Sequence, residues 1–526
     1  MLPKRLQERP LPEEFARKLL VHSTNAKSGS LATGELHEVY SPYFSAPLGH
    51  VGVGSVADVE KAFELARHAQ KQWQERPIAA RARVIKRFHD LVKKHSDLLA
   101  DIVQLETGKD RTAAYDEVLD VMNNARYYAN NAEKFLATSS KAGAFPVITS
   151  TTQQRVPKGI VGQISPWNYP LALGVSDAIA ALIAGNGIVA KPDWQTPFSN
   201  LIALHLLLNA GLPHNLFQIV TGSGTVVGQA IAQRCDYLMF TGSTATGKLL
   251  GKVVGERLVG YSAELGGKNP MIIAPDADVA KHADTIATAC FSNSGQLCVS
   301  IERIYAHTDI YDEFLRAFKA ATEKLTLGSG LNWNYSMGSL INQDQLDRVT
   351  AFVEDAVAKG ATVVTGGKAR PDVGPYHFEP TILTDLGPDT DLETEEVFGP
   401  VVYVQRVDSL EEAVELANDT NYGLNASVFG ATETAERLAW QIETGSVTIN
   451  DGYAATWASI STPLGGVKES GMARRHGPEG MTKYTEVKNI AQQRIMPMRG
   501  PKQLPRKYYG QLMTTALDLG KKLKFL

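Results

Sequence analysis

Apolar residues recur at two spacings along the chain, and the spacing changes near residue 159. Before that point, 59–74 and 79–100 carry apolar side chains at helical spacing among Lys, Arg and Glu, which predicts surface helices that cover a core. After it, short apolar runs alternate with longer apolar stretches of helical length. We predict strands at 160–164, 187–191, 217–221 and 237–241. Strands that alternate with helices indicate a mostly parallel sheet.

A second alternation of the same kind runs from about residue 265 to residue 450. Its apolar runs predict strands at 269–274, 302–307, 361–365, 401–405 and 446–450. We therefore predict a second α/β unit.

Two segments outside both units alternate polar and apolar residues. They are 147–156 and 484–495, and we predict that they form an extended arm that pairs with another subunit. The tail after residue 498 returns to Lys, Arg and Leu at helical spacing, for which a solvated or interface helix is favoured over membrane attachment.

Length and charge narrow the classes of protein. The chain has 526 residues, 44% of them hydrophobic, and at about 100 to 200 residues per domain this length suggests a multidomain protein with a large core. Its 53 basic and 56 acidic residues leave a formal net charge of -3. Such a balance gives no global field that would attract nucleic acid or an anionic membrane.

Membrane and export signals are weak. Residues 169–190 are long enough to span a bilayer, but Asp177 and Asn186 favour a buried helix followed by a turn and a strand. Residues 1–20 contain charges and three prolines and lack the apolar run of a signal peptide. We predict a cytoplasmic protein.

The three cysteines are Cys235, Cys290 and Cys298, too few and too irregularly spaced for a disulfide framework or a zinc site. We expect no bound metal and a reducing compartment. Cys298 lies among small residues in SGQLCVS, although a free cysteine is more often an inert buried side chain than a nucleophile. Glu264 begins ELGGKNP, where glycines allow close approach of backbone and ligand, although a lone Glu there can be a solvated or capping carboxylate.

Two further segments follow predicted strands. ISPWNYP at 164–170 holds Asn168 between prolines at the sheet edge where α/β proteins bind ligands, although such an Asn can simply form a turn. FTGSTATG at 240–247 leads from a strand into a helix, and its backbone N–H groups suit a pyrophosphate. It does not match GxGxxG, and a glycine-rich turn alone is weak evidence.

Taken together, these segments resemble the aldehyde dehydrogenase superfamily from about residue 30 to residue 495. The shared motifs are PWN at 166–168, FTGS at 240–243, ELGGKNP at 264–270, GQLC at 295–298 and EEVFGP at 395–400. Within the superfamily, 262–271 and 474–480 are most similar to bacterial NADP-dependent succinate-semialdehyde dehydrogenases.

The resemblance implies an α/β fold with a Rossmann-type cofactor domain, an α/β catalytic domain and a β-arm for oligomerisation. The implied boundaries are 30–142 with 157–263 for the cofactor domain, 264–460 for the catalytic domain, 143–156 with 484–497 for the arm, and 498–526 for a helical tail.

Aldehyde oxidation needs a nucleophile, because only a tetrahedral adduct can release hydride, and thiolate is the best biological choice. The resemblance assigns Cys298 as that nucleophile and the Asn168 amide with the Cys298 N–H as donors to the oxyanion. It assigns Glu264 as the general base that hydrolyses the thioester, a role that suits a carboxyl whose pKa burial raises toward neutrality.

The resemblance also implies a cofactor site and a substrate tunnel. Lys191 and Glu396 would hold the two ribose rings, Phe398 would brace the nicotinamide, and Trp167 with Ser243 would contact the pyrophosphate. The other implied cofactor contacts are Ile164, Ser165, Pro166, Trp194, Gly224, Phe240, Thr241, Gly242, Leu265 and Gly266. The implied tunnel residues are Tyr169, Phe291, Leu297, Val299, Tyr453, Trp457 and Leu464, for which ordinary core packing is the alternative.

Three features depart from the family pattern. Trp194 stands where NAD-preferring relatives usually place a glutamate, which favours NADP and leaves NAD possible. Ser176 and Ser292 stand where some succinate-semialdehyde enzymes use arginines to bind the substrate carboxylate, and Arg475 replaces a glutamate of many relatives. Since a buried carboxylate without a charge partner is unfavourable, either another cation serves or the substrate is not anionic.

We therefore predict an NAD(P)-dependent aldehyde dehydrogenase. Succinate semialdehyde is the first candidate substrate, and aromatic or medium aliphatic aldehydes are the alternative. Glu264 argues against a CoA-acylating enzyme, and the joint presence of Cys298, Glu264 and Asn168 argues against a catalytically silent binding protein. We expect self-association as a dimer or tetramer, a small-molecule aldehyde as partner, no nucleic acid and no membrane.

Overall fold

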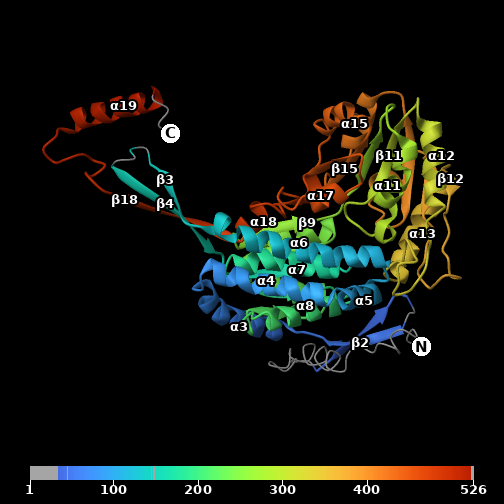
Figure 1. Ribbon diagram of the computed structural model, residues 1–526, viewed down its shortest axis with the longest axis horizontal. Helices are drawn as coiled ribbons and strands as arrows, with labels where there is room; N and C mark the ends of the chain where they lie inside the picture. The colour runs from blue at the N-terminus through green and yellow to red at the C-terminus, as the bar shows by residue number, and fades with distance from the viewer. Residues whose placement is uncertain (1–33, 44–45, 144, 146–147, 523–526) are drawn as a thin grey trace.

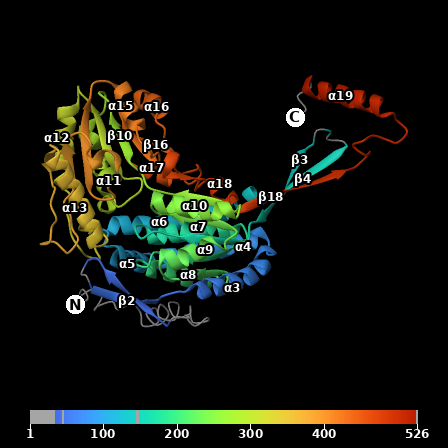
Figure 2. The ribbon, with the colours of Figure 1, turned by 180° about the vertical axis from the view of Figure 1, so that it is seen from behind.

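The computed structural model describes residues 34–43, 46–143, 145 and 148–522. The predicted domain boundary at residue 30 and the N-terminal segment 1–20 lie outside the described residues. Figures 1 and 2 show two α/β blocks beside each other and a thin arm that extends away from them toward the helix α19 (Arg506–Lys522).

The first block contains a six-stranded sheet in the order β17-β9-β8-β5-β6-β7. The strands are β5 (Ile160–Ile164), β6 (Gly187–Lys191), β7 (Phe217–Ile219), β8 (Tyr237–Thr241), β9 (Gly260–Glu264) and β17 (Gly471–Met472). The first five are parallel, and β17 is antiparallel at the edge. The chain proceeds from β5 outward to β7 and then returns to β8 on the other side of β5. The strand order therefore reverses between β5 and β8, the kind of place where α/β sheets bind ligands.

Strand residues of this sheet alternate between two cores. Ile160 packs with α3 (Val56–Gln74), α9 (Gln229–Ala232) and α10 (Thr244–Glu256), whereas its neighbour Val161 packs with the helices of the opposite face. Those helices are α4 (Ile78–Lys94), α5 (Ser96–Thr107), α6 (Arg111–Leu136), α7 (Pro170–Ile183) and α8 (Phe198–Asn209). This alternation is the two-residue period of a strand buried on both faces.

The second block contains a seven-stranded sheet in the order β12-β13-β14-β11-β10-β15-β16. Its strands are β10 (Asn269–Ile273), β11 (Ile301–His307), β12 (Thr362–Thr365), β13 (Thr381–Thr384), β14 (Val401–Val407), β15 (Asn425–Phe429) and β16 (Ser446–Ile449). Its helices are α11 (Val279–Phe291) and α12 (Tyr311–Thr322) on one face, and α13 (Gln343–Ala358), α15 (Leu410–Asn418) and α16 (Thr432–Ala439) on the other. Short helices α14 (Asp391–Thr394), α17 (Ala454–Ala458) and α18 (Glu479–Thr482) complete the fold.

The arm is a three-stranded antiparallel sheet of β3 (Ser139–Ala142), β4 (Thr149–Pro157) and β18 (Thr485–Gln493). Its strand β3 falls within 30–142, the segment that the sequence analysis placed in the cofactor domain. The four residues SSKA carry no apolar alternation of their own, so only their pairing with β4 identifies them as a strand. A separate hairpin joins β1 (Leu36–Ser41) and β2 (Ala46–Gly52).

Most predicted strands are present, and β5, β6 and β8 match the predicted bounds. The buried helix predicted within 169–190 is also confirmed as α7 followed by β6. The segment 79–100 is two helices rather than one, because the backbone leaves helical geometry at His95 between α4 and α5. Strands β9, β13 and β15 were not predicted. Among the described residues, every helix is too short or too polar to cross a bilayer.

Candidate active site

The carboxyl ends of the parallel strands bring several predicted cofactor residues to one edge of the six-stranded sheet. Ile164 at the end of β5 pairs with Lys191 of β6 and with Phe240 of β8. One strand further, Thr241 pairs with Glu264. Ser165 continues the edge, where its N–H donates to the Lys191 carbonyl at 3.2 Å. These contacts place the predicted residues beside the point where the strand order reverses.

The start of α10 is open at this edge. Ser243 is exposed and caps the helix, accepting a hydrogen bond from the Thr246 N–H at 3.4 Å. Gly242 precedes it, and a Cβ there would lie 2.6 Å from the Phe240 ring. Gly224 opens a short π-helical segment, Gly224–Gly228, and has open space around it. Exposed N–H groups at a helix start are suited to phosphate.

Lys191 and Trp194 flank the same edge. Lys191 is buried, its Nζ donates to the Pro192 carbonyl at 3.2 Å, and burial lowers the pKa of its ammonium while Asp193 raises it. The Trp194 ring stacks on His37 of the β1–β2 hairpin, with centroids 4.4 Å apart and planes inclined by 8°. The hairpin therefore holds the Trp194 indole in place beside Lys191 at this edge.

Glu396 and Phe398 approach this edge from the second block. Glu396 Oε1 accepts a hydrogen bond from the Gly267 N–H at 2.7 Å, and a Cβ at Gly266 would lie 2.5 Å from Oε2. Burial and the neighbouring Glu302 carboxylate raise the pKa of Glu396 to about 8. The Phe398 ring meets Trp167 edge-on at 5.4 Å. Leu265 N–H donates to the Ser470 carbonyl at 2.9 Å, which holds the start of the glycine pair.

A strained loop presents Cys298. Asn293, Ser294 and Gly295 are consecutive residues in the left-handed region, with φ of 50°, 55° and 71°. A Cβ at Gly295 would lie 2.1 Å from the Gly399 carbonyl oxygen, so only glycine fits there. Such strain in non-glycine residues persists where surrounding contacts enforce it and is typical of functional sites.

The three cysteines differ in exposure. All are free, and Cys235 and Cys290 are buried whereas Cys298 is partly exposed. The Cys298 carbonyl accepts a hydrogen bond from Asn269 Nδ2 at 2.7 Å, which anchors the residue to β10. Desolvation, followed by the Glu264 and Glu396 charges, raises the pKa of the Cys298 thiol to about 12. Without ligands the thiol is therefore protonated at neutral pH.

Glu264 ends β9 as a buried carboxyl, and its Oε1 has no hydrogen-bond partner among the described residues. Desolvation raises the pKa of Glu264 to about 7, against the opposing charges of Arg475 and Lys483. Both cations face Asp177, at 3.2 Å from Arg475 Nε and 3.5 Å from Lys483 Nζ. A carboxyl with a pKa near neutrality can both accept and release a proton at physiological pH.

Asn168 is bonded to the cysteine loop. Its side-chain Nδ2 donates to the Gln296 main-chain carbonyl at 3.0 Å, and the main-chain carbonyl of Asn168 accepts a hydrogen bond from Lys109 Nζ at 2.6 Å. Lys109 in turn pairs with Glu117 at 2.7 Å, with both side chains fully buried. The sequence analysis did not identify Lys109, Glu117 or Gln296. The sequence signal for Lys109 was its place after Gly108 at the end of a helix, where a lysine side chain is commonly solvated.

A second buried pair missed from the sequence supports the Glu396 loop. Lys268 Nζ lies 2.7 Å from Glu302 Oε2. Glu302 also accepts hydrogen bonds from the N–H groups of Val397 and Phe398, at distances of 3.0 to 3.1 Å. The available signal was a glutamate at the start of the predicted strand 302–307.

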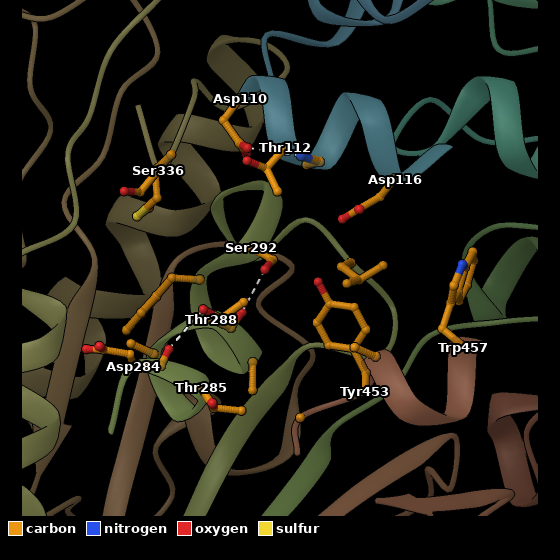
Figure 3. A pocket seen from close by; sticks show the side chains of 18 of the residues that line it. Asp110, Thr112, Asp116, Asp284, Thr285, Thr288, Ser292, Ser336, Tyr453 and Trp457 are labelled. Atoms are coloured by element: carbon orange, nitrogen blue, oxygen red, sulfur yellow. Dashed lines mark hydrogen bonds between the residues drawn. The ribbon is translucent and has the colours of Figure 1, made fainter. Parts of the chain in front are cut away.

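A cavity of about 960 Å³ opens next to the cysteine loop. Its wall includes the predicted tunnel residues Tyr169, Phe291, Leu297, Tyr453 and Trp457, whereas Val299 and Leu464 are buried and are not part of the wall. Cys298 packs against the buried cluster around Tyr169, and Tyr453 and Trp457 pack against the same cluster. Figure 3 shows side chains from α6, α11 and α17 gathered around this space.

The two serines at the positions of relatives' arginines are both engaged. Ser176 Oγ donates to Asp120 Oδ2 at 2.5 Å, and Ser292 Oγ donates to the Thr288 carbonyl at 2.8 Å. Neither position supplies a positive charge. The arrangement thus combines a thiol, a buried carboxyl of near-neutral pKa, a side-chain amide and a phosphate-compatible sheet edge around an aromatic cavity.

Comparison with known proteins agrees with this arrangement. A model of the aldehyde dehydrogenase family matches residues 30–490. A Mycobacterium tuberculosis protein (strain ATCC 25618 / H37Rv), provisionally named NADP(+) succinate-semialdehyde dehydrogenase 2, is 50% identical over 474 residues, which are 90% of this chain and 91% of that protein.

Two solved structures share the fold at 32% identity. An E. coli NADP-dependent enzyme has a TM-score of 0.84 and is matched over 88% of this chain and 95% of its own. A betaine aldehyde dehydrogenase from Staphylococcus aureus in complex with NAD+ has a TM-score of 0.83 and is matched over 88% of this chain and 92% of its own.

Proposed function

Because this chain belongs to the aldehyde dehydrogenase family, we propose that it oxidises an aldehyde to its carboxylate through a covalent adduct on Cys298. Hydride is transferred to NADP, with NAD as a possible substitute. The observation that best supports this proposal is the position of Cys298. It is the only partly exposed cysteine, it lies on a strained loop bonded to Asn168, and it packs against residues of the aromatic cavity wall.

Cys298 and Asn168 act first. The thiol gives its proton to water, and the thiolate sulfur adds to the aldehyde carbon while the carbonyl π electron pair moves to oxygen, which gives a tetrahedral adduct with an oxyanion. The Asn168 amide and the Cys298 N–H donate to the new oxyanion, and in other enzymes the loss of one such donor raises the barrier by roughly 2.7 to 4 kcal/mol. The bond from Asn168 to the Gln296 carbonyl keeps the amide beside the cysteine loop.

Glu264 acts after hydride has left and a thioester remains. Its carboxylate removes a proton from the attacking water, and collapse of the second adduct releases the carboxylic acid and the thiol. The Glu264 charge raises the pKa of the Cys298 thiol. Thiolate and carboxylate therefore disfavour each other, which suits groups that are needed as anions at different steps.

The sheet edge fits a dinucleotide. The exposed start of α10 offers backbone N–H groups, and within the part of the chain that the structure describes the buried Lys191 ammonium has a single hydrogen bond, to a carbonyl. Bound there, NADP or NAD supplies the hydride acceptor. Lys191 and Glu396 would hold the two riboses, and Trp167 and Phe398 would form one wall. The relatives' names and the absence of a carboxylate at Trp194 support NADP as the preferred form.

The name of the M. tuberculosis relative supports succinate semialdehyde as a substrate. The aromatic wall residues Tyr169, Tyr453 and Trp457 support the alternative class, aromatic or medium aliphatic aldehydes.

We propose the domain division given by the family resemblance, with the arm as the contact between copies in a dimer or tetramer. The apolar side chains of Val487 and Ile490 on β18 are exposed, which supports a covering partner. Three free cysteines support a reducing compartment such as the cytoplasm.

The test is a turnover assay of the purified full chain with NADP and, separately, NAD. Succinate semialdehyde, benzaldehyde and hexanal are the substrates, and reduced cofactor is measured at 340 nm. We expect oxidation of at least one aldehyde and higher kcat/KM with NADP. Lack of reduced cofactor with every aldehyde and both cofactors would contradict the proposal.

A further inference from the structure

The charges around the substrate cavity are of one sign. Its wall contains five carboxylates, Asp110, Asp116, Asp120, Asp284 and Asp451, and contains no lysine, arginine or histidine. Three of them are committed to local contacts: Asp110 caps α6, Asp120 accepts from Ser176 and Asp451 accepts from the Ala455 N–H. The side chains of Asp116 and Asp284 are exposed, and no hydrogen bond or ion pair among the described residues engages them.

Of these two carboxylates, the one of Asp116 points into the cavity (Figure 3). Figure 3 shows its carboxylate projecting from α6 into the space between Ser292, Tyr453 and Trp457. Desolvation raises the pKa of the Asp116 carboxyl, and the positive charge of Lys109 lowers it. A positive group of a ligand would therefore be stabilised beside this carboxylate, and a negative group would be repelled.

Three cations behind the wall are each paired with a carboxylate. Lys109 pairs with Glu117 at 2.7 Å, and Arg475 with Asp177 at 3.2 Å. Arg111 pairs with Asp97 at 3.2 Å and with Asp101. A substrate carboxylate in this cavity would thus find no uncommitted cation among these three.

Independent features of the cavity indicate a ligand. The Tyr169 side chain is 5% exposed and lines the cavity, and its hydroxyl has no hydrogen bond among the described residues. The rings of Trp457 and Tyr453 stand on the opposite side of the space from α11 (Figure 3). Lys109 Nζ already lies 3.6 Å from the centroid of the Tyr169 ring, and the Arg475 guanidinium lies 5.8 Å from that of Trp457. The Tyr453 ring, next to the carboxylates, is therefore the aromatic face suited to an ammonium group of a ligand.

We propose that this cavity selects aldehydes that carry a positive charge at the end remote from the carbonyl, such as ω-ammonio aldehydes, and that Asp116 is the main specificity-determining residue. Asp284 contributes at the rim. The inference rests on the proposed aldehyde oxidation and ranks its substrates: cationic aldehydes first, neutral ones next, and succinate semialdehyde last.

The test uses three aldehydes of similar size and different charge. They are 4-(trimethylammonio)butanal, its neutral isostere 5,5-dimethylhexanal, and succinate semialdehyde. With the full chain and saturating NADP at low salt, we expect kcat/KM for the cation to exceed that for the isostere by about tenfold. The preference should shrink in 0.5 M NaCl, because salt screens partly exposed charges.

Asp116→Asn should lower the ratio of kcat/KM for the cation to kcat/KM for the isostere by at least about threefold. Asp284→Asn should have a smaller effect of the same sign. Asp408→Asn is the matched control, because Asp408 is also exposed. Asp408 follows the end of β14, whereas Cys298 precedes the start of the parallel strand β11. Asp408 therefore lies at the opposite edge of the sheet from Cys298. It should leave the ratio unchanged.

The outcomes separate the two proposals. Turnover of the isostere together with an equal or higher kcat/KM for succinate semialdehyde than for the cation would overturn the charge inference and leave aldehyde oxidation standing. The same holds if Asp116→Asn folds and leaves the ratio unmoved, or, should that variant fail to fold, if salt leaves the wild-type ratio unmoved. Failure of all three aldehydes would overturn the proposed function itself.

Discussion

The cofactor edge and the substrate cavity are built in different ways. At the edge, strand register, glycines and a helix start position the key groups. In the cavity, side chains from α6, α11 and α17 and from the loop 333–337 face one another. Main-chain geometry tolerates sequence change, whereas side-chain walls change with each substitution. We therefore expect substitutions in the cavity wall to change the choice of aldehyde more than substitutions at the cofactor edge do.

The largest expected effect comes from replacing the nucleophile, which should lower turnover in the cavity and leave binding at the cofactor edge almost unchanged. Cys298→Ala should lower kcat by about 10³-fold or more, because no other thiol reaches the cavity, while the dissociation constant for NADP stays within about threefold. Activity by reduced-cofactor formation and binding by fluorescence titration measure the two effects. Cys235→Ala and Cys290→Ala are controls and should remain active. Substantial turnover by Cys298→Ala would exclude this thiol as the nucleophile.

Glu264→Gln should separate the two halves of the reaction. Acylation and hydride transfer precede the step that needs the base, so a burst of reduced cofactor should persist while steady-state turnover falls by about 100-fold. Because the pKa of Glu264 is raised to about 7, the carboxyl is protonated below that pH, and wild-type turnover should rise with pH through about 7 and then level. Stopped-flow bursts and a pH profile are the measurements. A variant that keeps the wild-type profile would show that another group is the base.

The strained loop links both regions, and Gly295→Ala should disturb it. An added Cβ would lie 2.1 Å from the Gly399 carbonyl at a φ of 71°, so we expect a loss of about 2 to 4 kcal/mol in the free energy of unfolding and a displaced Cys298. Gly255→Ala, in α10 with open space around it, is the control and should gain about 0.5 to 1 kcal/mol. Urea unfolding compares them. Equal stabilities of the two variants would contradict the assigned strain.

The smallest expected effect is confined to the cofactor edge. Trp194→Glu should lower kcat/KM for NADP and spare or raise that for NAD, changing their ratio by about tenfold through repulsion of the 2′-phosphate. The choice among aldehydes should be unaffected. Steady-state kinetics with both cofactors measure the ratio. If the wild type prefers NAD, or the ratio stays constant, Trp194 does not set the preference, and the indole stacked on His37 acts only through its volume.

Sequence reasoning succeeded where local pattern and local structure coincide. Strands β5, β6 and β8 are continuous apolar runs between turn residues, and their bounds were predicted correctly. Strand β15 was missed because it begins with the buried Asn425, whose amide is satisfied by the carbonyls of Val299 and Gly452. That compensation comes from residues distant in sequence, so no local pattern could show it.

The candidate site was predictable as a set of residues, while its electrostatics were not. Cys298, Glu264 and Asn168 follow from their motifs, and the absence of arginine at Ser176 and Ser292 is visible in the sequence. Which charges compensate one another is a property of the fold. The pairing of Lys109 with Glu117 and of Arg475 with Asp177 joins residues from different segments and leaves Asp116 in the cavity wall without an ion pair among the described residues.

The protonated state of the Cys298 thiol also affects how readily the resting protein is oxidised or alkylated. Peroxide and alkylating reagents attack thiolates, and the raised pKa of the Cys298 thiol keeps it protonated at neutral pH. The resting protein should therefore resist sulfenic acid formation and react slowly with iodoacetamide. Electrophilic inhibitors aimed at this cysteine would gain little from thiol reactivity and would depend on their own warhead strength and their fit to the acidic cavity.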